Sequence, residues 1–378
     1  MKTSLSDKIT VISFVLIIFI LSITNLISPN ISFSENENRY LAKKPNLEWE
    51  TIVSGEYSKN FEEYIIDHFI HRDKWVGLKS LSEIAMLKKE NNSVFFAKDG
   101  YLIEKHLDKD IDKEHLERNI QRLIEFTNKN SNMNLSIMLI PTASNILKDK
   151  LPSFAQIYDQ DKLIDTVKNR LESGIFVDVR DIFKQNKDNY IYYKTDHHYT
   201  TKGAFLAYQE WCKAMGANGL KEKDFNINPV SKNFFGTLYS KSNLYTTKPD
   251  TIYTYIPKEK ISYEVDYNMG EKITDTLYET SYLDKKDKYS MFLNGNNPLV
   301  KIKSSNKNGK NLLVIKDSFA HSFVPFVAND FENVHMIDLR YFNMSMEKYI
   351  EENNITDVLV LYNTINFATD PNMSGLIK

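Results

Sequence analysis

From residue 113 to the end of the chain, segments with a helical spacing of apolar residues alternate with short, continuous apolar runs. The helical segments are residues 113–129, 160–172, 201–215 and 345–353, and the apolar runs are residues 135–140, 175–179, 312–315, 334–337 and 358–362. Runs this short predict buried strands rather than helices. Strands that alternate with helices predict an α/β fold, in which a mostly parallel sheet is covered by helices on both faces.

The alternation stops between about residues 220 and 308. This stretch is rich in Tyr, Lys, Asn and Asp and contains no clear long helix, so we predict a β-rich insertion there. The α/β domain that contains the insertion is expected at residues 111–378. A signal anchor is expected at residues 1–30, and a juxtamembrane segment with the N-terminal part of the domain at residues 31–110.

Two local patterns fall in the N-terminal third of the chain. Residues 57–90 have a helical spacing, which predicts helices with one apolar face, and Trp75 and Leu78 continue that pattern. Residues 95–103 predict a short β-hairpin, because an Asp-Gly pair there has the usual chemistry of a tight turn.

The composition limits the classes of protein to consider. With 42% hydrophobic and 26% charged residues, the chain is globular rather than disordered. A formal net charge of -2 excludes a nucleic-acid partner, because no basic excess is present to neutralise phosphates. Cys212 is the only cysteine, so no intrachain disulfide can form, and its neighbours predict a small buried side chain.

The N-terminus predicts the location of the protein. Lys2 and Lys8 precede an uncharged apolar stretch from Ile9 to Ile27, which as a helix would span about 28 Å, close to the hydrocarbon thickness of a bilayer. No Ala-x-Ala cleavage site follows, so we favour an uncleaved anchor over a cleaved signal peptide. The lysines stay inside, which predicts a single-pass protein of the cell membrane with its bulk extracellular.

Three residues in two segments have the chemistry of a serine catalytic triad. Ser318 follows an apolar run at a predicted strand-to-helix turn, where α/β folds present active-site groups. Asp196 and His198 stand two residues apart, just before a predicted helix. Serine is a weak nucleophile that needs a histidine base, itself oriented by an acid. We therefore predict that Ser318, His198 and Asp196 meet and are catalytic.

Other interpretations of these residues stay open. In an extended segment Asp196 and His198 point the same way while His197 points to the opposite side, which suits the triad. Adjacent imidazoles also bind zinc, although no third ligand at a suitable spacing is visible. Asp196 could also be a capping residue beside two structural histidines, and Asp317 and Ser318 would make good helix caps with no catalytic role.

The segment from Thr195 to Ala204 resembles the Thr-Asp-x-His-Trp-x-x-x-Gly-Ala signature of the SGNH-hydrolase-like proteins of bacterial alginate O-acetylation, and it also resembles the DHHW proteins of Gram-positive bacteria. The resemblance implies a three-layer SGNH-hydrolase-like domain and assigns the triad to the same three residues. Two positions depart from the pattern: Tyr199 replaces the usual Trp, and Lys316 replaces the Gly that precedes Asp-Ser.

The expected function is an extracellular, membrane-anchored serine acyltransferase or esterase acting on O-acetyl groups of a cell-envelope polysaccharide. Backbone amides near Ser318 are expected to stabilise the oxyanion. The second oxyanion donor is not identified, and Asn145, Gly236 and Asn363 are the candidates. No cofactor and no metal is expected. The expected partners are the polysaccharide, the membrane and a membrane protein that donates the acyl group. The alternative is a non-catalytic glycan-binding or assembly protein on the same fold.

Overall fold

The computed structural model describes residues 4–27 and 31–378, and these divide into two compact units. The smaller unit contains the chain up to Lys88 together with Asn243–Thr246, and the larger unit contains Lys89–Ser242 and Thr247–Lys378. The strands of the N-terminal hairpin belong to the larger unit.

The larger unit is built on one seven-stranded sheet with the order β10-β9-β11-β13-β12-β14-β6. Its strands are β6 (Asn134–Ile140), β9 (Tyr263–Tyr267), β10 (Lys272–Thr274), β11 (Leu299–Ser304), β12 (Asn311–Lys316), β13 (Asn333–Ile337) and β14 (Asp357–Asn363). The strands β13, β12, β14 and β6 are parallel, as predicted, while β11, β9 and β10 extend the sheet with antiparallel pairing. Three strands of the expected insertion are therefore part of the main sheet.

One predicted strand is absent from the part of the chain that the structure describes. Residues 175–179 make a single bridge from Phe176 to Ile137 of β6, with two backbone hydrogen bonds, and then leave the sheet edge. The chain leaves the sheet edge where the Asp178 carboxylate pairs with the Arg180 guanidinium, with 2.6 Å between Asp178 Oδ2 and Arg180 Nη2. An apolar run alone does not show how many residues will pair with the neighbouring strand.

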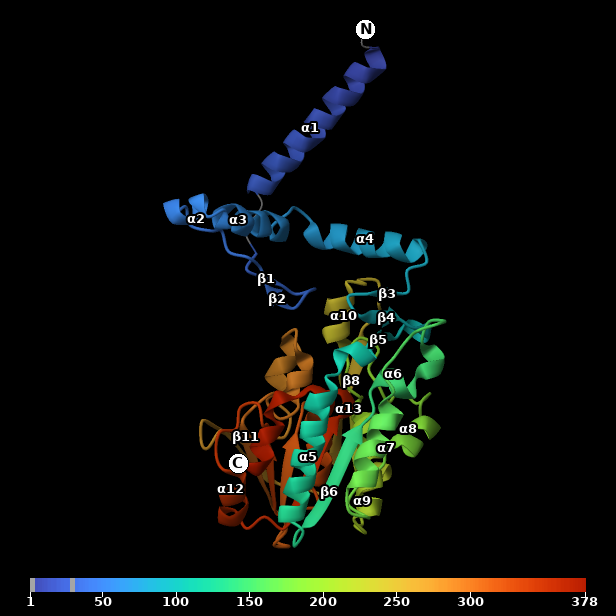
Figure 1. Cartoon of the computed structure of the whole chain (residues 1–378), viewed down its shortest axis with the longest axis vertical. Helices are drawn as coiled ribbons and strands as arrows, with labels where there is room; N and C mark the ends of the chain where they lie inside the picture. The colour runs from blue at the N-terminus through green and yellow to red at the C-terminus, as the bar shows by residue number, and fades with distance from the viewer. Residues whose placement is uncertain (1–3, 28–30) are drawn as a thin grey trace. The chain divides into compact units, whose positions relative to one another are not determined.

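Each face of the sheet has its own hydrophobic cluster. One cluster includes α9 (Thr201–Ala214) and α11 (Ala320–Val327). The other includes α5 (Lys113–Lys129), α7 (Gln160–Arg170), α12 (Met346–Glu352) and α13 (Thr364–Thr369). Along β12, Val314 belongs to the first cluster and Leu313 and Ile315 to the second, because successive strand residues point to opposite faces. Figure 1 shows α5 and α7 beside β6.

Smaller elements surround the sheet. They are β3 (Glu90–Asn91), β4 (Val94–Phe96), β5 (Leu102–Glu104), α6 (Ala143–Ile146), α8 (Arg180–Gln185), β7 (Phe225–Phe234), α10 (Thr237–Ser242) and β8 (Asp250–Pro257). The predicted hairpin is confirmed: β4 and β5 are antiparallel, and Asp99 and Gly100 adopt φ angles of 58° and 77° in the turn. Cys212 is buried, as expected.

The smaller unit contains α1 (Leu5–Ile27), β1 (Phe33–Ser34), β2 (Arg39–Tyr40), α2 (Trp49–Val53), α3 (Glu56–Asp67) and α4 (Arg72–Ala85). By length and composition, α1 is apolar enough to cross a membrane. The helices predicted between residues 57 and 90 are present, and two residues of the predicted apolar pattern, Trp75 and Leu78, are 52% and 57% exposed. Helical spacing shows where an apolar face lies, not whether other residues cover it.

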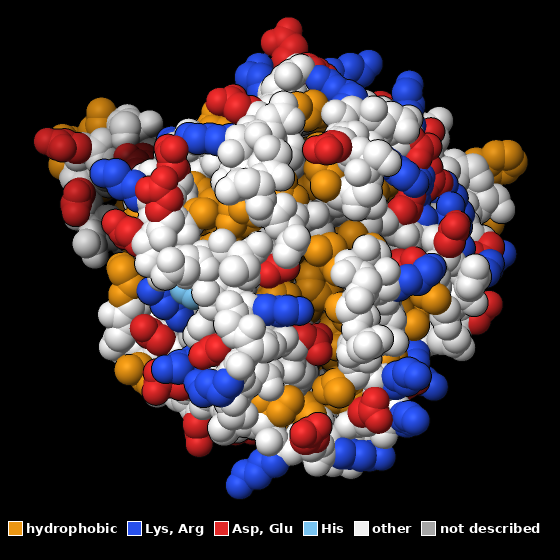
Figure 2. All heavy atoms as spheres, turned by 90° about the horizontal axis from the view of Figure 1, so that it is seen from below, with side chains coloured by type: hydrophobic (Ala, Val, Ile, Leu, Met, Phe, Trp, Pro, Cys, Tyr) orange, Lys and Arg blue, Asp and Glu red, His pale blue; other side chains and the backbone are white. Residues whose placement is uncertain are grey.

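The surface carries both signs of charge. On the face shown in Figure 2, Lys and Arg side chains are interspersed with Asp and Glu side chains, without a continuous basic area. This distribution agrees with the small net charge of the chain.

Candidate active site

Ser318 lies in the turn that joins β12 to α11, and the neighbouring Asp317 holds this turn in place. One Asp317 oxygen, Oδ1, accepts the backbone N–H of Phe319 at 2.9 Å. The other, Oδ2, accepts the backbone N–H and the side-chain amide of Asn363, both at 2.8 Å, and the amide of Asn366 at 2.9 Å. Burial raises the pKa of the Asp317 carboxyl. The turn is therefore tied to the carboxyl end of the adjacent strand β14.

The segment with Asp196 and His198 precedes α9, and a carboxylate from a distant strand fixes it. Asp250 of β8 is buried and accepts the backbone N–H groups of Lys194 and Thr195 at 2.9 and 2.7 Å. It also accepts the Thr195 hydroxyl at 2.6 Å and the Tyr190 hydroxyl at 2.5 Å. Sequence reasoning missed Asp250, because nothing in the local pattern around it indicates such a partner.

The three residues predicted as the triad lie in hydrogen-bond contact. His198 Nε2 is 2.8 Å from Ser318 Oγ, and His198 Nδ1 is 2.6 Å from Asp196 Oδ1. Asp196 Oδ2 accepts the backbone N–H of Thr237 at 2.8 Å and its hydroxyl at 3.1 Å. A carboxylate, an imidazole and a hydroxyl in this order can relay a proton away from the hydroxyl.

Gly236 allows the close approach that holds Asp196. A Cβ atom at this position would lie 2.2 Å from Asp196 Cβ and 2.3 Å from Asp196 Oδ2, so only glycine fits without displacing the carboxylate. The Gly236 N–H donates to the Thr195 hydroxyl at 3.0 Å. The backbone at Gly236, just before α10, therefore packs directly against the Asp196 side chain.

Aromatic rings surround the His198 imidazole. Tyr289, in the short 3-10 helix Lys288–Met291, lies nearly parallel to it with ring centroids 3.8 Å apart, and Phe319 is 5.1 Å away. Burial lowers the pKa of His198 to about 4. Burial alone would raise the pKa of Asp196, but the charges of the two histidines and the hydrogen bonds to the carboxylate lower it. At neutral pH the pair is therefore an aspartate with an unprotonated imidazole, which can accept a proton.

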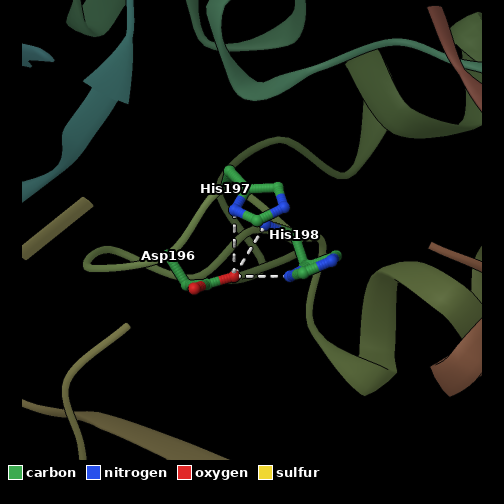
Figure 3. A group of neighbouring side chains, drawn as sticks. All are labelled: Asp196, His197 and His198. Carbon is green, nitrogen blue, oxygen red and sulfur yellow. Dashed lines mark hydrogen bonds and ion pairs between the residues drawn. The ribbon is translucent and has the colours of Figure 1, made fainter. Parts of the chain in front are cut away.

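The position of His197 differs from the prediction. The segment bends instead of running extended, so the ligand atoms of Asp196, His197 and His198 all lie within 4.8 Å of one another. Figure 3 shows the His197 ring turned toward Asp196, and its Nδ1 is 3.8 Å from Asp196 Oδ1 and 2.7 Å from the Thr237 hydroxyl. The bend has a physical cause, because Asp250 clamps the residues just before it.

This clustering supplies the third ligand that the zinc interpretation lacked. However, the Asp196 carboxylate already accepts four hydrogen bonds: two from His198 (backbone N–H and Nδ1) and two from Thr237 (backbone N–H and hydroxyl). A metal ligand needs a free lone pair pointing at the ion, so binding would require several of these bonds to break. The four hydrogen bonds to Asp196 therefore favour its role as the acid that orients His198 over a role as a metal ligand.

Most N–H groups of the turn after Ser318 are already used within the protein. Phe319 donates to the Asp317 carboxylate, Ala320 to the Asp317 carbonyl at 3.2 Å and His321 to the Ser318 carbonyl at 3.2 Å. Within the described part of the chain, the Ser318 N–H has no acceptor. The expectation of several backbone amides near Ser318 is thus reduced to the N–H of Ser318 itself.

The three candidates for a second oxyanion donor also have partners. The Asn145 amide donates to Asp161 at 3.0 Å, the Gly236 N–H donates to Thr195, and the Asn363 backbone and side chain donate to Asp317. Gly236 therefore contributes to the site through close packing rather than as a donor.

Lys316, which stands where the motif that this sequence resembles has glycine, belongs to a buried charged group. Its Nζ is 2.7 Å from Asp338 Oδ2 and 2.8 Å from His321 Nε2, and Arg340 also pairs with Asp338 at 2.6 Å. Burial lowers the pKa of Lys316, while Asp338 opposes that effect. The lysine is paired away from Ser318, so the departure from glycine leaves the Ser318–His198 contact intact.

Comparisons with known proteins agree with this architecture. A family model described as "DHHW protein" matches residues 128–337. A DHHW family protein from Eubacterium siraeum is 26% identical, with a TM-score of 0.65, over 76% of this chain and 95% of that one. Bacillus cereus PatB1 with a sulfonyl adduct is 22% identical, with a TM-score of 0.63, over 75% of this chain and 100% of that one.

A more distant match is the O-acetyltransferase domain of Pseudomonas putida AlgJ, which is 15% identical with a TM-score of 0.45, over 75% of this chain and 98% of that one. No functionally curated protein is similar enough in sequence to count as a match. The family model and the Eubacterium siraeum structure confirm the resemblance of the Thr195–Ala204 motif to the DHHW proteins.

Proposed function

Because the chain belongs to the DHHW family, and because His198 joins Ser318 to Asp196, we propose that it is a serine acyltransferase or esterase. Its substrates are O-acetyl groups of an extracellular cell-envelope polysaccharide. The observation that carries the proposal is the pair of contacts made by His198, 2.8 Å to Ser318 and 2.6 Å to Asp196. Similar solved structures support the fold, of SGNH type with three layers, on which such a site would lie.

The reaction proceeds in two acyl transfers. His198 Nε2 takes the Ser318 proton as Oγ attacks the acetyl carbonyl, and the Ser318 N–H donates to the developing oxyanion. The imidazolium returns that proton to the departing alcohol, which leaves an acetyl-serine. A sugar hydroxyl or water then loses its proton to His198 and attacks the acetyl group. As the bond between Oγ and the acetyl carbon breaks, the imidazolium gives this proton to Ser318 Oγ, which restores the serine and the neutral base. Asp196 orients the imidazole and stabilises its charged form. No step requires a cofactor.

The location follows from α1. We assign it as a single-pass anchor in the cell membrane, with the remainder of the chain outside, where a membrane protein supplies the acyl group. Two features support this: the uncharged helix is long enough to span a bilayer, and Lys2 and Lys8 precede its apolar core. Expressed with its N-terminus intact, the protein should sediment with membranes, and its mature form appearing in the medium with a start near residue 30 would contradict the anchor.

One observation favours a non-catalytic role as the second candidate. Of the backbone N–H groups from Ser318 to His321, three already have acceptors in the protein. An oxyanion hole with a single donor stabilises the oxyanion less well than one with two. A glycan-binding or assembly protein could keep this fold without turnover.

The two candidates are separated by assaying the purified protein on a small acetyl ester. The acyltransferase or esterase account predicts measurable turnover that falls by roughly 10⁴-fold or more in Ser318→Ala and in His198→Ala, because either change removes nucleophile activation. Turnover that is equal in wild type and both variants would rule out the triad. A folded protein with no turnover of any acetyl donor would favour the binding role.

A further inference from the structure

A small pocket with both polar and apolar lining residues lies next to the turn that carries Ser318. It has a cavity volume of about 40 Å³, and it is lined by Phe319, by His197, by Glu104 and His106 at the end of β5, and by Asn366 of α13. Two of the lining rings, His197 and Phe319, also contact the His198 imidazole, with ring centroids 3.8 and 5.1 Å from it. The pocket therefore lies beside the base that serves Ser318.

Hydrogen bonds and ion pairs fix the polar side chains of this pocket in place. The Glu104 carboxylate accepts the Lys241 ammonium at 2.7 Å through Oε1, and its Oε2 lies 3.6 Å from His106 Nε2. The Asn366 amide is held by Asp317 at 2.9 Å. Side chains fixed in this way lose little conformational entropy when a ligand binds. Glu104 and His106 serve no step of the acyl transfer described above.

The remaining hydrogen-bonding capacity suits hydroxyl groups. His197 uses Nδ1 for Thr237, and among the described residues its Nε2 has no partner. A carboxylate, two imidazoles and an amide together offer both donors and acceptors, which is what a sugar hydroxyl needs because it both donates and accepts. The aromatic face of Phe319 adds an apolar wall.

The charge of the pocket points to one class of sugar. Within the part of the chain that the structure describes, its lining contains no Lys and no Arg, and Glu104 is its only acidic residue. Lys241 pairs with Glu104 from outside the lining and has 43% of its side chain exposed. An anionic sugar would place its negative charge close to the Glu104 carboxylate, and no Lys or Arg among the described lining residues would neutralise it. Like charges in close contact oppose binding.

We propose that this pocket receives one ring substituent of a neutral sugar residue of the polysaccharide, because a cavity of about 40 Å³ has room for a substituent and not for a whole sugar ring. Glu104 then discriminates against anionic sugars such as uronic acids, in which that substituent is a carboxylate. This inference rests on the proposed function, since it names the substrate class of the same site. Glu104 and His106 are then residues that determine specificity, while Ser318, His198 and Asp196 carry the chemistry.

The test compares two acetyl esters that differ only in charge: a methyl glucoside and a methyl glucuronide, acetylated on the same hydroxyl. The wild-type protein should have a kcat/KM about tenfold or more higher for the glucoside, which corresponds to ~1.4 kcal/mol. Glu104→Gln should reduce this preference, because the negative charge is lost. Lys241→Gln should increase it, because Glu104 loses its counter-charge.

Glu90→Gln is the matched control. Glu90 lies in β3 of the same small sheet and also pairs with a lysine, Lys105, at 2.7 Å, but it does not line the pocket. Its substitution should leave the preference unchanged.

Turnover with equal kcat/KM for the two esters in the wild type, or a preference that Glu104→Gln does not alter, would overturn this inference and leave the acyltransferase or esterase account intact. No turnover of either ester, with Ser318 unreactive toward a serine-directed probe, would overturn both.

Discussion

The phenol ring of Tyr289 lies parallel to the imidazole of His198, with ring centroids 3.8 Å apart and an interplanar angle of 11°. The same tyrosine donates its hydroxyl to the Ser318 carbonyl at 3.2 Å. One side chain from the 3-10 helix Lys288–Met291 therefore contacts both the base and the backbone of the nucleophile. We interpret Tyr289 as a positioning residue, which keeps the imidazole aligned and shielded from water.

Tyr289→Leu should reduce kcat/KM by roughly 3- to 10-fold, the equivalent of losing ~0.5–1.5 kcal/mol of ring packing. It should also move the acid limb of the pH profile to higher pH, since burial is what lowers the pKa of His198. Tyr289→Phe keeps the ring and should change both less. The rates and the pH profile are measured on the same small acetyl ester, and an unshifted profile in Tyr289→Leu would show that the ring does not shield the imidazole.

The acid limb of the wild-type profile should have its midpoint near 4, the value to which burial lowers the pKa of His198. The sign follows from the role of the base: as the pH falls through this value the imidazole gains a proton and can no longer accept the one from Ser318. An unperturbed histidine would give a midpoint near ~6.5. Circular dichroism at each pH separates loss of the base from unfolding. A midpoint near 6.5 in a folded protein would mean that His198 is solvated or is not the base.

Asp196→Asn should lower kcat by ~10²- to 10⁴-fold while leaving the fold intact, because the amide supports the wrong tautomer of His198. His197→Ala should have a smaller effect, of about tenfold or less. It removes one bond to Thr237 and one wall of the pocket, but no proton acceptor for Ser318. Equal losses in His197→Ala and His198→Ala, together with a bound metal ion in the purified protein, would instead support the zinc interpretation.

Gly236→Ala should disable the site, because the added methyl would lie 2.2 Å from Asp196 Cβ and displace that carboxylate. We expect a loss of activity of roughly 10²-fold or more, comparable with the loss of Asp196 itself, together with a lower melting temperature. Gly375→Ala is the control, since its Cβ comes no closer than 3.1 Å to the end of the Leu339 side chain. Full activity in Gly236→Ala would mean that the backbone there shifts easily and does not hold Asp196.

The parts of this protein that follow a short-range pattern could be predicted from the sequence. The helix at 113–129 and the strand run at 135–140 follow from their periodicity and length, and the structure has them at Lys113–Lys129 and Asn134–Ile140. The contact between His198 and Ser318 could be anticipated from residue chemistry and from the resemblance of one motif, although the two residues are 120 apart in sequence.

The parts that depend on long-range contacts could not be predicted. Asp250, Tyr289 and Gly236 all come from the stretch interpreted as an insertion, where no periodicity indicates which side chain will reach the site. The bend that brings His197 back to Asp196 depends on Asp250, so an extended backbone was the natural but wrong assumption. The exposure of Trp75 was missed for a similar reason, because helical spacing does not reveal whether a neighbouring element covers the face.

The central claim is that Ser318 is a nucleophile activated by His198, and covalent labelling tests it most directly. The purified protein is incubated with a fluorophosphonate probe, digested, and analysed by mass spectrometry to locate the adduct. The account predicts a single adduct on Ser318 in the wild type, strongly reduced labelling in His198→Ala, and none in Ser318→Ala. A folded wild-type protein that shows no adduct at Ser318, or that is labelled there equally well without His198, would contradict it.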